Sequence, residues 1–230
     1  MDMKKILVFL LALVMSVSCT LILNQEVIRG NGKMAEQSYD IYGFDGIVVN
    51  GAMDVVYSQG PENVVLHAEE NLLAYYDVEV IDGSLVVRQR CHVSLVPRKS
   101  SVLVVSSPDL RKIKVSGSGD CAIKGGLVTG GDFSFSISGS GDLDADAITC
   151  DNLYLRISGA GDIDIDSATA NVINGSISGS GDMDIHCKDA GAIVLKISGS
   201  GDIELSGNAK SLSHKISGAG HVNARELLLD

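Results

Sequence analysis

The chain has 230 residues, with 26 Gly, 3 Pro, no Trp and a formal net charge of -11 at pH 7. This composition argues against a disordered chain and against a conventional helical enzyme core. The acidic charge argues against nucleic acid as a partner, because phosphate binding requires clustered Lys and Arg.

Residues 1–18 have the pattern of a signal peptide for export. Lys4 and Lys5 precede an apolar run from Ile6 to Val14, and small residues follow up to Cys19. The apolar run is too short to span a bilayer. We therefore expect this segment to direct export.

Cys19 closes the sequence Ser-Val-Ser-Cys, which resembles a bacterial lipobox. Acylation of this cysteine would anchor residues 19–33, a lipidated N-terminus and linker, in the cell envelope at the outer membrane. The alternative is an ordinary cleaved signal with an incidental cysteine. The residues after Cys19 lack an acidic cluster, which favours a periplasmic over a cell-surface position, but the leaflet stays open.

Residues 34–107 are expected to form a β-rich head region that is less regular than the rest. Residues 78–87, Val-Glu-Val-Ile-Asp-Gly-Ser-Leu-Val-Val, have Asp82-Gly83 at their centre, which predicts a hairpin with a primed turn. Ser107-Pro108-Asp109 marks the boundary with residues 108–230.

Residues 108–230 contain six copies of a Ser-Gly-Ser/Ala-Gly-Asp motif, the last ending in His221, whose starts are 22, 20, 20, 20 and 19 residues apart. The glycines supply a sharp turn at which no Cβ obstructs the neighbouring copies. These turn positions are Gly117, Gly119, Gly139, Gly141, Gly159, Gly161, Gly179, Gly181, Gly199, Gly201, Gly218 and Gly220.

Apolar and polar residues alternate on both sides of each turn, as in Leu143 to Asp146, which is the period of a half-buried strand. One copy, here called a rung, therefore has two strands, one sharp turn and one looser turn. Stacked rungs form a continuous core. The expected fold is all-β: a right-handed parallel β-helix, or solenoid, of about 20 residues per rung in the C-terminal half.

The motifs resemble the "putative auto-transporter adhesin, head GIN domain" family of exported Bacteroidetes proteins. The resemblance runs through residues 28–32, 44–51, 55–60, 70–72, 82–85 and 109–110 into the repeats, whereas Gly51-Ala52-Met53-Asp54 departs from the Gly-Ile-Asn core. It implies a right-handed β-helix that is shaped like pectin lyases without their catalytic residues, and a role in adhesion.

The rung alignment stacks two columns of carboxylates, one at the turn and one two residues later. A column tolerates this repulsion only where solvent or cations reach it. One hypothesis is that the columns bind Ca²⁺ ions as a ladder. The other is that the turn aspartates accept hydrogen bonds from turn amides and that the second column is a solvated face, with no metal and no cofactor. The candidate ligands of the second column are Asp144, Asp164, Asp184 and Glu204.

A basic position recurs six residues before the turn aspartate, at Lys114, Arg156, Lys196 and Lys215. It predicts that the two faces differ in the sign of their charge. Either these cations protect the edge and keep the protein soluble, or they form an adhesive face for glycans or a protein.

We do not expect an enzyme, because rungs of 19 to 22 residues leave no room for loops that would wall a cleft, and no histidine has a catalytic constellation. A non-enzymatic adhesin that binds glycan or protein is the leading hypothesis. A self-associating envelope scaffold, which is a homo-oligomer, and a lyase-like enzyme are the alternatives. Asp166-Ser167-Ala168 also fits a short O-glycosylation pattern of Bacteroidetes.

Overall fold

The computed structural model describes residues 26–230 as an all-β protein. In this range a single 3-10 turn, η2 (Leu73–Tyr75), is helical. The predicted signal peptide and Cys19 lie outside the described residues. No helix among residues 26–230 is long and apolar enough to cross a membrane.

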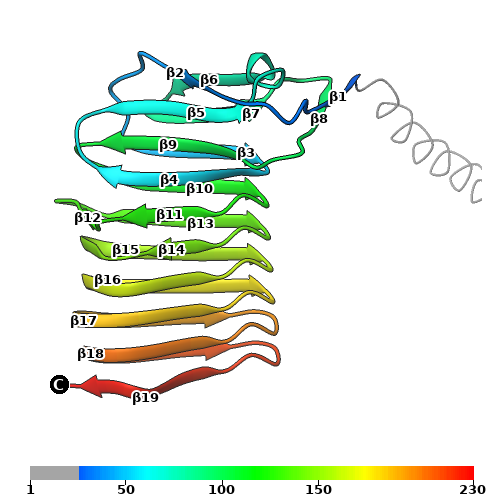
Figure 1. Cartoon of the computed structure of the whole chain (residues 1–230). Helices are drawn as coiled ribbons and strands as arrows, with labels where there is room; N and C mark the ends of the chain where they lie inside the picture. Colours follow the sequence, from blue (N-terminus) through cyan, green and yellow to red (C-terminus); the bar gives the residue numbers. More distant parts are fainter. Residues whose placement is uncertain (1–25) are drawn as a thin grey trace, which may run out of the picture.

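From β10 to β19 the strands are stacked in the order in which they occur in the chain (Figure 1). The strands are β1 (Glu26–Arg29), β2 (Met34–Ser38), β3 (Gly46–Gly51), β4 (Met53–Gln59), β5 (Asn63–Glu69), β6 (Tyr76–Ile81), β7 (Ser84–Gln89), β8 (Val93–Val96), β9 (Ser101–Ser107), β10 (Lys112–Gly117), β11 (Cys121–Lys124), β12 (Leu127–Val128), β13 (Phe133–Gly139), β14 (Leu143–Ala145), β15 (Ile148–Gly159), β16 (Ile163–Gly179), β17 (Met183–Ile197), β18 (Ile203–Ile216) and β19 (Val222–Leu229).

The repeats stack as parallel rungs. Ile157 of β15 lies opposite Ile177 of β16, which in turn lies opposite Ile197 of β17. Residues that share a place in the motif therefore share a column along the stack. The twenty-residue period of the sequence is the period of the sheet.

The expected looser turn is instead a third parallel strand segment. Ile148 pairs with Ala168, and Ala190 pairs with Ala209, all of them buried. The small buried side chains let the chain bend while it keeps its hydrogen bonds to the neighbouring rung. A rung therefore has three strand segments rather than the two that were predicted.

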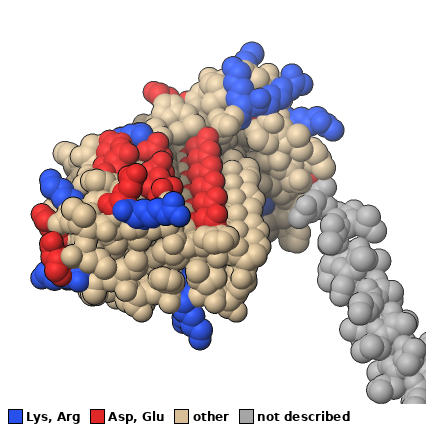
Figure 2. Space-filling model, turned by 90° about the horizontal axis from the view of Figure 1, so that it is seen from below, with Lys and Arg blue, Asp and Glu red and all other residues tan. Residues whose placement is uncertain are grey.

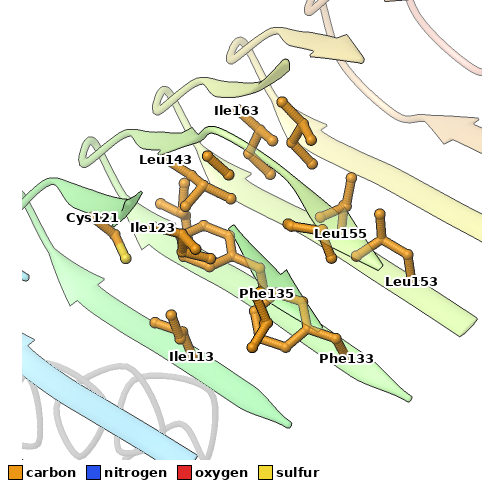
Figure 3. Packing of buried hydrophobic residues seen from close by; sticks show 14 of the residues in the cluster. Ile113, Cys121, Ile123, Phe133, Phe135, Leu143, Leu153, Leu155 and Ile163 are labelled. Carbon is orange, nitrogen blue, oxygen red and sulfur yellow. The ribbon is translucent and has the colours of Figure 1, made fainter. Parts of the chain in front are cut away.

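The core lies between these segments and is filled by the inward residues of each strand. Phe133 and Phe135 of β13 point inward from one side toward Ile123 and Leu143 of the facing strands (Figure 3). All four are at most 1% exposed. Burial of such side chains is the main stabilising term of a stack in which no single rung has a core of its own.

The stack begins within the head region. β3 and β4 pair in parallel with β10 and β11, and Gly51 lies opposite Gly117. β7 and β9 continue the stack in parallel, and β5 and β6 then close it in antiparallel fashion. The expected boundary at 107/108 thus falls inside one continuous sheet and one core.

The predicted hairpin is confirmed as β6 and β7, with Ile81 opposite Ser84. Asp82 and Gly83 have φ of 48° and 72°, as a primed turn requires.

Candidate ligand-binding face

Two outer faces of the stack differ in charge, as predicted from the rung alignment. The first, here called the carboxylate face, is formed by β4, β11, β14 and the N-terminal segments of β16 to β19. Figure 2 shows a straight column of acidic side chains with a second acidic cluster beside it. The two columns border a groove of about 850 Å³.

The turn aspartates form a hydrogen-bonded ladder between rungs. The backbone N–H of Asp182 donates to Asp162 Oδ1 at 2.8 Å, and that of Asp202 donates to Asp182 Oδ1 at 2.7 Å. The same contact is made throughout the stack, from Asp54 and Asp120 to Asp202 and His221. One carboxylate oxygen of each aspartate is therefore engaged by an amide of the next rung.

The second column places Asp144, Asp164, Asp184 and Glu204 side by side. Burial, and then the carboxylates of Asp184, Asp166 and Asp144, raise the pKa of Asp164 above its usual value. Lys124 relieves only one end of the column, because its Nζ lies 3.1 Å from Asp144 Oδ1.

Within residues 26–230 no group of three or more His, Cys, Asp or Glu side chains is arranged to hold a metal ion. The carboxylate columns are straight, and each aspartate faces its neighbours along the stack rather than a common centre. Six to eight oxygens converge on Ca²⁺ in a protein site, and the straight columns do not show this convergence.

The turn glycines serve the stack in two ways. Gly179 has a φ of 152°, which an L side chain rarely adopts. Gly181 has no positive φ, but a Cβ there would lie 1.9 Å from the carbonyl oxygen of Gly161. Gly181 thus differs from Gly179 in that its backbone does not require glycine, whereas the crowding by the adjoining rung that was predicted for the turn glycines is confirmed.

The opposite charge lies on what we call the basic face, formed by β10, β13 and the C-terminal segments of β15 to β18. Its strands place the predicted cations in one outward column, in the order Lys114, Ser136, Arg156, Ser176, Lys196 and Lys215. All four cations are exposed. We call this column the basic row.

The basic row has no internal charge partner. Residues 112–117, 133–139, 152–159, 172–179, 192–197 and 211–216 contain no Asp or Glu. Among the described residues none of the four cations forms an ion pair, whereas Lys124, Arg88 and Arg111 each do. Four unpaired cations are thus aligned on one face of a protein with a net charge of -11.

Two further features of the basic face were not predicted. Tyr154 and Val194 project outward beside Arg156 and Lys196, with 42% and 44% of their surface exposed. The sequence does contain the signal for their position. Each lies two residues before a cation of the basic row, and residues two apart on a strand point to the same side. A hollow of about 420 Å³ beside Arg156, Lys196 and Lys215 has Ser176 in its lining.

A single histidine–serine contact occurs among residues 26–230. His186 Nδ1 lies 2.9 Å from Ser206 Oγ on the carboxylate face. Among the described residues no carboxylate pairs with His186, so nothing orients the imidazole as a base in the way that a catalytic triad requires.

The buried cysteines offer no reactive thiol. Cys121, Cys150 and Cys187 are free and buried, and burial raises the pKa of the Cys150 and Cys187 thiols to about 11. Cys91 is also free, but it is exposed.

The fold and its faces define a class of all-β proteins that are built from stacked parallel rungs. Residues 43–186 and 155–230 match the family model described as "putative auto-transporter adhesin, head GIN domain". The chain belongs to this family. No curated protein matches it.

Solved structures of similar fold come from Bacteroides and Parabacteroides species. A putative adhesin from Bacteroides fragilis has 22% identity and a TM-score of 0.69, over 85% of this chain and 99% of that one. A putative adhesin from Parabacteroides distasonis has 21% identity and a TM-score of 0.71, over 86% and 99%. A putative lipid binding protein from the same species has 21% identity and a TM-score of 0.57, over 86% and 99%.

Proposed function

We propose that this chain is a non-enzymatic adhesin of the cell envelope that binds an anionic ligand through the basic face of a right-handed β-helix. The observation that carries the proposal is the basic row, whose cations have no carboxylate partner among the described residues. Charges that only stabilise the fold are expected beside opposite charges, as Lys124 is beside Asp144. The row is instead available to an external anion.

The flat shape of the basic face supports adhesion rather than capture of a small molecule. A repetitive surface makes many weak contacts, which add up through multivalency when the ligand is also repetitive. The carboxylate face repels the same ligand, so it restricts binding to one side. The proposal includes no catalytic step and no cofactor.

The test is the attachment of coated beads to mucin and to extracellular-matrix ligands. Arg156→Glu combined with Lys196→Glu is expected to abolish attachment, and increasing salt is expected to weaken the wild type. The matched control is Lys188→Glu with Lys210→Glu, two exposed lysines in the third strand segment. Attachment that survives the first pair, or is lost equally with the second, would overturn the proposal.

The proposal for localisation is export, followed by anchoring through lipid on Cys19. Cys19→Ser is expected to move the protein from the membrane fraction to the soluble fraction, because two or more acyl chains hold a protein stably at a membrane. Unchanged fractionation would count against the anchor. Protease added to intact cells then distinguishes a surface position from a periplasmic one.

Self-association is a second candidate function, favoured by the end of the stack formed by β18 and β19. No segment among residues 26–230 covers this end (Figure 1), and Leu228 and Leu229 are 70% and 57% exposed. Antiparallel pairing of β19 with β19 of a second copy would place Arg225 of each copy opposite Glu226 of the other. Uncovered strand edges are sites of such pairing.

The test of self-association is the mass of the protein in solution. Leu228→Glu with Leu229→Glu is expected to convert a dimer to a monomer without loss of bead attachment. A wild type that is monomeric at all concentrations would exclude this function and leave the adhesin proposal unaffected.

A further inference from the structure

From Lys114 to Lys196 the outward side chains of the basic face alternate with a period of two rungs, and exposed Lys215 then follows on the next rung without a serine between them. Exposed long side chains occur on one rung, as Tyr154 with Arg156 and Val194 with Lys196. The rung between them has half-buried polar side chains, Asn174 and Ser176. The same alternation begins earlier, with exposed Lys112 and Lys114 followed by half-buried Ser134 and Ser136.

This alternation separates Lys114, Arg156 and Lys196 from one another by a short polar side chain. Neighbouring parallel strands lie about 4.8 Å apart, so the backbones that bear Arg156 and Lys196 are about 9.6 Å apart. The short Ser176 side chain lies between them and lines the hollow of about 420 Å³, which continues to Lys215 on the next rung. The hydroxyl of Ser176 and the amide of Asn174 donate and accept hydrogen bonds but carry no charge.

A polysaccharide has the matching repeat. Each sugar of an extended chain advances by about the height of one rung. A chain laid along the stack would therefore place every second sugar beside a cation and the sugars between them over the Asn and Ser side chains. Tyr154 lies two residues from Arg156 on the same strand, where its exposed ring can pack against the apolar face of the sugar whose anion reaches Arg156.

We infer that the basic face binds a linear acidic polysaccharide with one anionic group on every second sugar, and that Tyr154 stacks on a sugar ring. This inference rests on the proposed function and specifies its ligand class. A chain with an anion on every sugar would place half of its charges over uncharged side chains. An acidic polypeptide has no sugar ring to stack on Tyr154, and its charges do not repeat at the two-rung spacing of the cations.

Direct binding to three probes in low salt tests the ligand class. The probes are hyaluronan oligosaccharides, with one carboxylate per disaccharide, polygalacturonate oligosaccharides, with one per sugar, and polyglutamate. We expect hyaluronan to bind most tightly. Ser136→Lys with Ser176→Lys places a cation on each of the two intervening rungs and is expected to shift the preference to polygalacturonate. Ser140→Lys with Ser180→Lys, at exposed turn positions, is expected to leave the preference unchanged.

The stacking role of Tyr154 has its own variants. Tyr154→Ala is expected to weaken hyaluronan binding by about 2- to 10-fold and to leave polyglutamate binding unchanged. Tyr154→Phe retains the ring and is expected to bind as the wild type does. Tyr42→Ala, which removes a ring that is 63% exposed in the head region, is the control.

The outcomes separate this inference from the proposed function. Equal binding of all three probes that is lost with Arg156→Glu and Lys196→Glu would leave an anion-binding face but refute the polysaccharide assignment. Preference for polyglutamate would indicate an acidic protein as the ligand and would also refute it. Failure of every probe to bind the wild type would refute the proposed function itself.

Discussion

At position 181 the preceding rung leaves room for glycine but not for a residue with a Cβ. The Cα of Gly181 lies so close to the preceding rung that an added Cβ would meet the Gly161 carbonyl oxygen at 1.9 Å and Ile157 Cγ2 at 3.0 Å. The first of these atoms belongs to the backbone and cannot rotate away. The spacing of the two rungs would have to change.

Gly181→Ala is therefore expected to lower the free energy of unfolding by about 2 kcal/mol or more. Ser180→Ala is the control, because Ser180 is exposed in the same turn and the equivalent position already carries Ala160 in the preceding rung. Denaturant unfolding measures both. A change for Gly181→Ala within about 0.5 kcal/mol would show that the rungs separate more easily than the structure indicates.

Glu69 holds the head region together through a buried carboxylate. Oε2 accepts a hydrogen bond from the backbone N–H of Arg98 at 2.7 Å, and Oε1 accepts one from Gly32. Burial by itself raises the pKa of Glu69, but these amide donors, that of Lys99 and the charge of Arg98 together lower it below the usual value of 4.5.

Because the pKa of Glu69 is lower in the folded state than in the unfolded state, its stabilising contribution is complete above the unfolded-state pKa and is lost as the pH falls through the folded-state pKa. Glu69→Gln is expected to lower the melting temperature at pH 7 and to differ less from the wild type toward pH 3. Glu70→Gln, at an exposed neighbour, is the control. A constant difference at all pH values would contradict the role of the charge.

At the scale of the element, the rung is the unit that can be removed. Deletion of residues 162–181 would bring β15 against β17, with Ile157 opposite Ile197 and the glycine turns in register. We expect a folded protein with one cooperative transition. Deletion of residues 162–171 breaks the register and is expected to abolish that transition, so equal thermal stability of the two deletions would refute the stacking.

The elements that the sequence predicted are those with a repeated or local signal. The turns and strands from Val115 onward follow from the motif, and the β6–β7 hairpin follows from Asp82-Gly83. The first rung was missed, although Asn50-Gly51-Ala52-Met53-Asp54 occupies the place of Ser116-Gly117-Ser118-Gly119-Asp120. Its second glycine is replaced by Met53, so only the pairing of β3 with β10 reveals the equivalence.

The candidate site was predictable to a similar degree. The basic row depends only on the repeat register, which the motif supplies. The absence of carboxylates around it is also visible in the sequence once the faces are known. The partner of each turn aspartate was not predictable, because the amide that it binds belongs to the next rung rather than to its own turn.

For the whole molecule, regular stacking concentrates charge of one sign on each face. On the carboxylate face Asp164 lies between Asp144 and Asp184 at the spacing of the strands, about 4.8 Å. The net charge of -11 adds to this repulsion. The same regularity that aligns the basic row for a ligand therefore costs stability on the opposite side.

Asp164→Asn is expected to raise the melting temperature in low salt and to stabilise the fold by a few tenths to about 1 kcal/mol. The raised pKa of Asp164 means that the wild type gains stability from this group as the pH falls through that pKa and loses it as the pH rises. The variant should therefore show less of this loss. About 0.5 M salt should shrink the difference, because it screens the column. The control is Asp40→Asn, which removes the same charge from an exposed site in the head region and is expected to have little effect on the melting temperature. An equal gain from both variants would show that the net charge, rather than the column, limits stability.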